Sequence, residues 1–517
     1  MKQLKQHIIL LLITVISGFG GAPTFVENEL IVRFETDLSP VDVEVVLMDQ
    51  PVLSHSQISR PLNLWLISLD LKQIQLHQMV KDMARQPEVI YVQLNHILTE
   101  RNTPDDPSFE QQWNFNNTGQ SGGLIDADVD APEAWEITTG GLTALGYEIV
   151  AGVVDGGCDL EHPDLLANLW SNPADTAGNG LDDDNNGWVD DSLGWNAFGH
   201  NGNIPTSSHG THVAGTIGAH SDNGNQVAGV NWSVKIMPVA GGSTNTAVAM
   251  EAYSYILEQK LTWIESLGLN GAFVVSANSS FGIDFADCES GDYPVWNDMY
   301  NSMGEAGILS VGATANRNTN VDEQGDVPTG CSSPYLVAVT NTTRFDVKAS
   351  SGYGLETIDL GAPGSSILST NYNQGTSTKT GTSMSAPHVT GAIALMHSAA
   401  NSGLAQFYVD NPALGALMFK QMLLTSVDTL SALQGLTVSG GRLNLHQAVL
   451  GALNWEPPGD GNLNYDGYVN VQDLIILTQL ILGNIEPSSV LLAAGDLNGD
   501  QLVTVQDLVR LIHLILL

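Results

Sequence analysis

The pattern of apolar and polar positions predicts a layered fold for the middle of the chain. Within residues 103–452, short apolar runs rich in β-branched residues occupy 147–155, 234–240, 271–280 and 307–316. Stretches with helical spacing separate these runs, and each run ends in small or polar residues. Continuous apolar strands that alternate with helices are typical of a parallel sheet covered on both faces. We therefore predict an α/β fold with a mainly parallel sheet, and functional sites beyond the carboxyl ends of its strands.

Residues 23–102 carry a different pattern, which predicts a small α+β unit. Strand-like alternation covers 28–34 and 63–71, helical spacing covers 76–86, and a further strand-like run covers 89–95. The stretch TERNTPDDP then indicates an exposed connector to the middle segment.

The N-terminus has the pattern of a secretory signal. Lys2 and Lys5 precede an apolar run at residues 8–16, and small residues follow as far as Ala22. We therefore predict a signal peptide at residues 1–22 and a secreted protein; the alternative is an uncleaved membrane anchor. No later segment has the roughly 20 apolar residues that a membrane span requires, so none is expected after signal removal.

A linker at 453–458 leads into an internal repeat at residues 459–517. Two copies of an acidic loop followed by an apolar helix start at Asn462 and Asp496, 34 residues apart. Each copy has the ligand spacing of an EF-hand loop, so we predict Ca²⁺ as a cofactor. The candidate ligands are Asn462, Asn464, Asp466, Asn470 and Asp473 in the first loop, and Asp496, Asn498, Asp500, Thr504 and Asp507 in the second.

The repeats resemble a dockerin domain, a small helical module of EF-hand type. The resemblance implies a cohesin-domain partner, which either half could bind through the equivalent pairs Val471-Gln472 and Val505-Gln506. The alternative is a tail that calcium merely stiffens. Gln501 stands where the turn favours glycine, and Asn462 replaces an aspartate, so both loops are expected to bind calcium less tightly.

The chain is strongly acidic, with 17 Lys and Arg against 56 Asp and Glu and a formal net charge of −39. Such a surface repels nucleic acid and anionic membranes, and it suits solubility, salty surroundings or hard cations. The acidic loop at 179–191 is a further candidate calcium site, although a solvated acidic loop is the alternative. Its candidate ligands are Asp182, Asp184, Asn186 and Asp190.

Three motifs in the middle segment carry the groups needed for nucleophilic catalysis. Asp155 lies in VVDGGCDLEHPDL, His209 in SSHGTHVAGTIGA and Ser383 in GTSMSAPHVTGAIALM. A serine hydroxyl needs a base before it can attack a carbonyl, and a histidine can accept and return that proton near neutral pH. A carboxylate orients the imidazole. We therefore predict a catalytic triad whose serine begins a helix, where free N–H groups can meet an oxyanion.

These motifs resemble the subtilisin-like serine peptidases over most of residues 103–450, and the order Asp, His, Ser is that of subtilisin itself. The resemblance implies a three-layer fold and an inhibitor-like propeptide at residues 23–102. It also implies Asn316 as the oxyanion-hole asparagine and Asp164 as a calcium ligand. The substrate-binding strand that walls the P1 pocket would contain Ser280, Phe281 and Gly282.

Two positions depart from the family pattern. Gly156 stands where a Ser or Thr normally follows the catalytic aspartate, and Ala315 stands where glycine commonly precedes the asparagine. The three cysteines allow one intramolecular disulfide after export. Cys288 and Cys331 are the favoured pair, and we interpret Cys158 as a small buried residue.

The sequence thus predicts a calcium-stabilised, secreted serine endopeptidase that acts on proteins or peptides and carries a C-terminal dockerin-like module. The alternative is a catalytically inactive scaffold that works through docking. The intact set of catalytic groups at Asp155, His209, Asn316 and Ser383 argues against that alternative.

Overall fold

The computed structural model describes residues 25–35, 38–47, 51–70, 73–96, 103–456, 461–464, 468–485, 489–497 and 502–516. The predicted signal peptide at residues 1–22 lies outside these ranges. The chain divides into two units, Met1–Glu100 and Arg101–Leu517, which are described separately. Among the described residues, no helix combines the length and apolar character needed to cross a bilayer.

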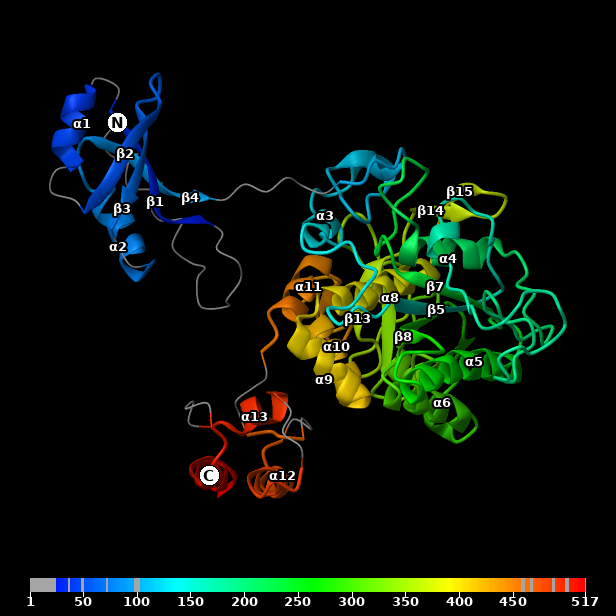
Figure 1. The fold of residues 1–517 in the computed structure, drawn as a ribbon. Coiled ribbons are helices and arrows are strands. Elements are labelled where there is room, and N and C mark those ends of the chain that lie inside the picture. Colours follow the sequence, from blue (N-terminus) through cyan, green and yellow to red (C-terminus); the bar gives the residue numbers. More distant parts are fainter. Residues whose placement is uncertain are drawn as a thin grey trace. The chain divides into compact units, whose positions relative to one another are not determined.

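The first unit is a four-stranded antiparallel sheet with two helices (Figure 1). The strand order is β2-β3-β1-β4, and the core is formed by apolar side chains such as Leu30, Val32 and Ile67. The predicted α+β character, the three predicted strands and the predicted helix are confirmed, while α1 and β2 were not predicted. The elements are β1 Phe25–Phe34, α1 Pro40–Leu47, β2 Val52–Ser59, β3 Leu64–Leu69, α2 Gln73–Met83 and β4 Val89–His96.

The second unit contains, in its described residues, a nine-stranded sheet of order β16-β17-β13-β12-β10-β8-β5-β7-β6. Neighbouring strands run parallel except β16 and β17, so the predicted, mainly parallel sheet is confirmed. The four apolar runs form β5, β7, β8 and β10. The strands are β5 Ile149–Asp155, β6 Trp195–Asn196, β7 Lys235–Ala240, β8 Phe273–Ser279, β10 Leu309–Ala313, β12 Leu336–Thr342, β13 Leu360–Pro363, β16 Asp428–Thr429 and β17 Gly441–Arg442.

Helices cover both faces of this sheet, as Figure 1 shows. Along β5, Ala151 and Val153 join the core shared with α4 (Ser208–Gly218) and α8 (Thr382–Ala399). Val150 and Val154 join the core shared with α5 (Thr246–Glu265) and α6 (Pro294–Glu305). Every residue of β5 is buried, because its two sets of side chains are each covered by a helical layer. This is the three-layer architecture that the apolar runs predicted.

The other helices within residues 103–456 of this unit are α3 Ala131–Trp135, α7 Val321–Gln324, α9 Ser402–Asp410, α10 Pro412–Thr425 and α11 Leu445–Leu453. A short antiparallel strand pair joins β9 Ile283–Asp284 to β11 Asp326–Val327, and a hairpin pairs β14 Ile367–Asn371 with β15 Gly375–Lys379. A disulfide joins Cys288 and Cys331, the favoured pair.

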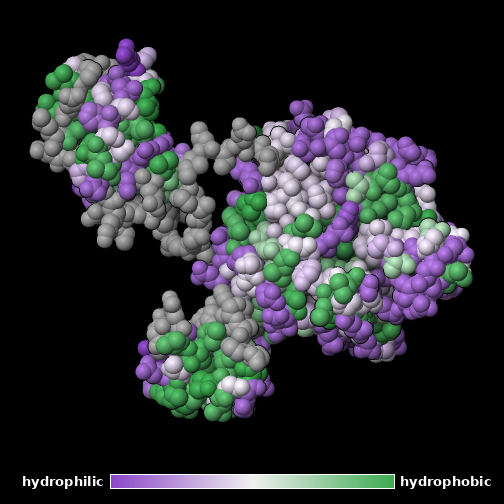
Figure 2. Space-filling view, viewed as in Figure 1, coloured by the Kyte–Doolittle hydropathy of each residue, from purple (hydrophilic) through white to green (hydrophobic). Residues whose placement is uncertain are grey.

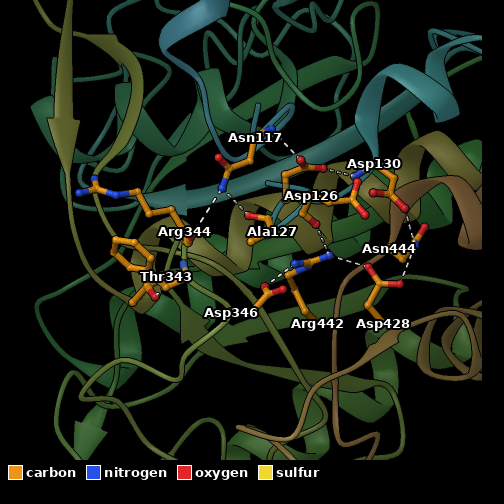
Figure 3. A network of polar contacts seen from close by, with 12 residues as sticks. Asn117, Asp126, Ala127, Asp130, Thr343, Arg344, Asp346, Asp428, Arg442 and Asn444 are labelled. Atoms are coloured by element: carbon orange, nitrogen blue, oxygen red, sulfur yellow. Dashed lines mark hydrogen bonds and ion pairs between the residues drawn. The ribbon is translucent and has the colours of Figure 1, made fainter. Parts of the chain in front are cut away.

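A buried arginine ties distant segments of this unit together (Figure 3). The Arg442 guanidinium forms ion pairs with Asp346 and Asp428, and it donates to the carbonyl of Asp126. Asn444 links Asp428 to Asp130 through its side-chain amide, at 2.9 and 2.6 Å. One cation therefore holds three acidic segments that are remote in sequence.

The C-terminal module contains α12 Val471–Ile481, α13 Ser489–Gly495 and α14 Val505–Leu516. Leu477 and Leu511 occupy equivalent repeat positions and share its small core. The same symmetry continues outside, where Val471 and Val505 are both more than half exposed. Figure 2 shows a largely hydrophobic surface over α12 and α14. The predicted helical repeat is confirmed.

Candidate active site

Asp155 and His209 form a hydrogen-bonded pair at the carboxyl edge of the sheet. Asp155 ends β5 and is buried, and its Oδ2 lies 2.8 Å from Nδ1 of His209 near the start of α4. Because an ionised carboxylate can only accept, Nδ1 carries the proton and Nε2 remains available as a base. The backbone N–H of Gly156 donates to Oδ1 at 2.7 Å and fixes the carboxylate plane.

The local sequence explains how α4 places the His209 imidazole beside Asp155. Ser207 caps the helix, since its hydroxyl accepts from the N–H of Gly210 at 3.2 Å. Gly210 permits close packing against the carboxyl end of β5. A Cβ at that position would lie 2.0 Å from the carbonyl oxygen of Gly157 and 3.0 Å from Oδ1 of Asp155. The glycine after His209 is therefore what lets helix and carboxylate approach.

Ser383 begins the central helix α8, as predicted. Gly381 precedes it with φ 156° and ψ 166°, a conformation essentially reserved for glycine, and turns the chain into the helix. The Ser383 hydroxyl donates to the carbonyl of Ser280 at 3.4 Å rather than to His209. Catalytic hydrogen bonds are often long or misaligned without substrate, so this arrangement is compatible with a nucleophile.

Asn316 is held beside Ser383 with its amide nitrogen available. Its Oδ1 accepts from the backbone N–H of Thr382 at 2.9 Å and lies 3.2 Å from the Thr382 hydroxyl. With the oxygen committed, the Nδ2 group is the end left to donate. The side-chain amide and the first N–H groups of α8 together can hold a developing oxyanion.

A pocket of about 70 Å³ opens beside Ser383. Ser280, Phe281 and Gly282 line it, together with Asn316 and Ser383, so the structure brings these predicted residues together. The hydroxyl of Ser280 also donates to the carbonyl of Ser383 at 3.1 Å. Sequence reasoning missed two other residues of this wall, Asp284 and Asp326, because they are brought together by the pairing of two short strands and stand 42 residues apart in the sequence.

The two departures from the family pattern have structural counterparts. A Cβ at Gly156 would lie 3.2 Å from the Ser207 hydroxyl, so the helix cap occupies the space beside this glycine. Ala315 is buried, and its N–H donates to Oδ2 of Asp326 at 3.1 Å. Neither departure displaces a predicted catalytic group.

Two neighbouring residues, His212 and Cys158, are buried, and Cys158 was interpreted from the sequence as a small buried residue. His212 is fully buried, with Nε2 near the carbonyl oxygens of Ile367 and Ser377, and burial lowers its pKa to about 3. Burial raises the pKa of the Cys158 thiol to about 12, so it is not a nucleophile.

The predicted calcium ligand Asp164 lies in a buried acidic corner. One oxygen accepts from the N–H of Val227 at 3.1 Å, while Oδ1 is buried without a hydrogen bond. Asp106, which was not predicted, is similar: Oδ2 accepts from the N–H of Asp222 and Oδ1 has no partner. Burial, and then the charge of Asp164, raise the pKa of Asp106 to about 6. Two carboxylate oxygens without hydrogen bonds are the kind of ligand that a hard cation such as Ca²⁺ binds.

The acidic loop at 179–191 is held by its own backbone. Asp182 accepts from the N–H groups of Asn186 and Gly187, while Asp190 accepts from Gly180. Asp184 accepts from the Asn186 amide. In the described parts of the chain, no three His, Cys, Asp or Glu side chains gather as a ready metal cluster. The calcium assignment of this loop therefore remains a prediction.

The C-terminal loops are described in part. Asp473 and Asp507, at the last ligand position of each loop, are fully buried and accept backbone N–H groups of their own loops. Asn462, Asn464, Asn470, Asp496 and Thr504 are also described, whereas Asp466, Asn498 and Asp500 lie outside the described residues. The inward-turned carboxylates fit an EF-hand-type loop that closes on a cation.

Comparison with known proteins supports both modules. The model of the subtilase family matches residues 146–441, which is more than half of the chain, and that of the dockerin type I domain matches residues 460–516. The large module thus carries the family's motifs, and the C-terminal module is a dockerin type I domain.

Relatives with similar sequences include two extracellular proteases. An extracellular protease of Xanthomonas campestris pv. campestris is 31% identical over 412 residues, covering 74% of this chain and 63% of that protein. An extracellular basic protease of Dichelobacter nodosus is 30% identical over 365 residues, covering 63% and 53%. The chain spans less than two thirds of the length of these two relatives. A solved structure of proteases from Pseudoalteromonas arctica PAMC 21717 is 24% identical, with a TM-score of 0.47, and covers 68% of this chain and 100% of that chain.

Proposed function

Because the chain belongs to the subtilase family of subtilisin-like serine peptidases, we propose that it is an extracellular endopeptidase that cleaves proteins through an acyl-enzyme on Ser383. The observation that carries this proposal is the 2.8 Å pair between Asp155 and His209 at the same sheet edge as Ser383 and Asn316. Extracellular relatives and the dockerin module support a location outside the cell.

The geometry suggests a specific role for each group. His209 takes the Ser383 proton at Nε2 while the serine oxygen attacks the substrate carbonyl carbon. The resulting oxyanion accepts hydrogen bonds from Asn316 Nδ2 and from N–H groups at the start of α8. His209 then protonates the leaving amine, and a water molecule hydrolyses the acyl-enzyme by the same route. Asp155 stabilises the imidazolium and does not itself take a proton.

Hydrolysis of casein by the purified chain tests the proposal. Ser383→Ala is expected to reduce cleavage to background, because it removes the attacking oxygen. Ser385→Ala is the matched control. This serine lies two residues after Ser383 in α8, is buried and makes no hydrogen bond through its hydroxyl. Equal hydrolysis by the wild type and Ser383→Ala would favour the inactive scaffold instead.

We further propose that calcium stabilises the protein. The unsatisfied oxygens of Asp106 and Asp164 support a site in the peptidase module, and the buried Asp473 and Asp507 support sites in the dockerin module. A bound cation would neutralise these carboxylates and fix their loops. Chelation is expected to lower the melting temperature, and Asp164→Asn is expected to reduce that effect. An unchanged melting temperature on chelation would contradict the proposal that calcium stabilises the protein.

The N-terminal unit is proposed to be a propeptide that is removed near residue 102. Its separate core and its position ahead of the peptidase module support this role. N-terminal sequencing of the secreted, active protein is expected to begin close to residue 103. A mature chain that still begins near Pro23 would contradict it.

The dockerin module is proposed to bind a cohesin domain through either of its halves. Val471 and Gln472 on α12 and the equivalent Val505 and Gln506 on α14 are all exposed. Pull-down on the Ser383→Ala background, with a panel of cohesin domains, tests this symmetry.

In that pull-down, Val471→Asp and Val505→Asp are each expected to retain binding, because the other half remains intact. The double variant is expected to lose binding. Leu267→Asp is the control, since Leu267 is 87% exposed and lies on the peptidase module. Full binding by the double variant would exclude this surface.

A further inference from the structure

The pocket beside Ser383 is lined by two carboxylates that have no role in the triad. Asp284 and Asp326 are opposite each other in the antiparallel β9–β11 strand pair, and both line the pocket that Ser280, Asn316 and Ser383 also line. Its volume of about 70 Å³ is several times the roughly 10–15 Å³ that one water molecule needs. The end of a substrate side chain can therefore enter it.

Asp326 is the buried member of the pair. It is 1% exposed, and its Oδ2 accepts from the Ala315 N–H at 3.1 Å, from the Thr314 hydroxyl at 3.2 Å and from the Thr329 hydroxyl. Among the described hydrogen bonds, none reaches Oδ1 of this side chain. The hydrogen bonds of Oδ2 thus fix the carboxylate to the wall of the pocket, and Oδ1 is available to a group that enters the pocket.

The charges around the two carboxylates differ. Asp284 is partly exposed and forms an ion pair with Arg317, whose Nη2 lies 2.6 Å from its Oδ2. Asp326 has no ion pair with any described residue. Burial raises the pKa of Asp326 to about 6, and the negative charge of Asp284 contributes in the same direction. At neutral pH the pocket therefore contains one carboxylate whose charge is not compensated.

We propose that Asp326 makes this pocket select Lys or Arg at P1, the substrate residue whose carbonyl Ser383 attacks. The inference rests on the proposed peptidase function and adds the substrate class. A P1 cation supplies the partner that Oδ1 lacks, whereas an apolar P1 side chain leaves a buried carboxylate dehydrated and unpaired. Sites with buried polar groups reject ligands that cannot pair with them more strongly than apolar pockets reject a wrong shape.

A purely structural role for Asp326 predicts a different result. Through Ala315 and Thr314 the carboxylate braces the loop that carries Asn316, so a bracing residue would lower kcat for every substrate alike. A specificity residue changes the ratio of kcat/KM between basic and apolar substrates. The ratio separates the two roles even where the absolute rates fall.

The experiment compares peptide substrates that differ only at P1, with Lys, Arg, citrulline, Leu or Phe at that position. The full chain is expected to favour Lys and Arg over Leu by at least about tenfold in kcat/KM, the ratio that a net gain of about 1.4 kcal/mol produces. Citrulline, which has the shape of arginine without its charge, is expected to lose that advantage. This series needs no variant, so it stands even if a variant fails to fold.

Asp326→Asn is expected to reduce the Lys-to-Leu ratio by at least about tenfold, since the amide retains an oxygen for the wall but no charge. Asp284→Asn is the matched control, and a smaller reduction is expected because Arg317 already neutralises that carboxylate. A wild-type enzyme that cleaves Leu or Phe substrates as well as Lys overturns the selection. An Asp326→Asn variant that keeps the full Lys preference overturns the assignment to this residue. Failure to cleave any of the peptides or casein would instead count against the peptidase function itself.

Discussion

Replacing Arg442 with methionine tests whether one buried cation holds the three acidic segments of Figure 3 together. The arginine side chain is 3% exposed, and its partners Asp346 and Asp428 are 19% and 36% exposed. Removing one member of a buried ion pair costs about 3–5 kcal/mol, because the other charge is left uncompensated. The exposure of the partners favours the lower value of about 3 kcal/mol. At about 2 °C for each kcal/mol in a large domain, the melting temperature falls by roughly 6 °C.

The cost of Arg442→Met also depends on pH, in a direction that the structure fixes. Burial raises the pKa of Asp128 to about 6 and that of Asp130 to about 7, while Arg442 lowers both. Groups with a raised pKa bind more protons in the folded state, so their contribution to stability falls as pH rises from about 4 to about 7. Without Arg442 the pKa values of Asp128 and Asp130 rise further, so the loss of stability with rising pH is larger in the variant. The difference in stability between Arg442→Met and the wild type is therefore expected to grow from pH 5 to pH 8.

The assay is thermal unfolding on the Ser383→Ala background, which prevents self-digestion, at pH 5 and pH 8. Arg317→Met is the matched control, because Arg317 also pairs with an aspartate but is 55% exposed, and its loss is expected to cost less than about 1 kcal/mol. Equal melting temperatures for the two variants, or a cost for Arg442→Met that does not change with pH, would refute the reasoning.

Three further predictions follow from single contacts. Asn316→Ala is expected to lower kcat by about 10²–10³ with little change in KM, a loss measured on subtilisin itself; unchanged kcat would exclude it from the oxyanion hole. Lys260 is buried among aromatic rings, and burial holds its pKa well below the usual range. The unfolded chain regains a proton there, so Lys260→Met is expected to raise the melting temperature, more at pH 6 than at pH 9. Gly210→Ala is expected to cost about 1–3 kcal/mol of stability and most of the activity, because its Cβ would lie 2.0 Å from the Gly157 carbonyl oxygen. Gly451→Ala is its control, since the nearest atom outside its own helix lies at 3.7 Å and helical alanine stabilises.

The parts that the sequence could predict are those encoded locally. The runs at 147–155 and 271–280 each contain a continuous apolar stretch, Ile149–Val154 and Ala272–Val275, and each becomes a strand that is buried on both faces. Asp155, His209 and Ser383 stand out because each lies in a run of small residues that close packing requires, as Gly210 illustrates. The structure brings these groups to one sheet edge.

Other elements could not be predicted because their signals are weak or misleading. The helix Pro40–Leu47 has valines at alternate positions, which favours a strand, yet Ser39 and Asp42 cap it through reciprocal hydrogen bonds. The strand Val52–Ser59 is mostly exposed and polar, because it lies at the sheet edge. Arg442 contacts Asp126 and Asp346 from distant segments, and Asp326 pairs with Asp284, 42 residues before it, so no local pattern reports these contacts.

The contact between Arg442 and Asp126 spans 316 residues, and this separation has a kinetic consequence. Closing this very long loop lowers the conformational entropy of the chain before the contact contributes any favourable energy. The parallel strands add further pairings between distant residues. Such a topology forms slowly, and interactions that complete late in folding also raise the barrier to unfolding. We expect long native lifetimes as a result. For the proposed peptidase, which would be surrounded by active copies of itself, a rarely opened backbone limits the exposure of cleavable segments.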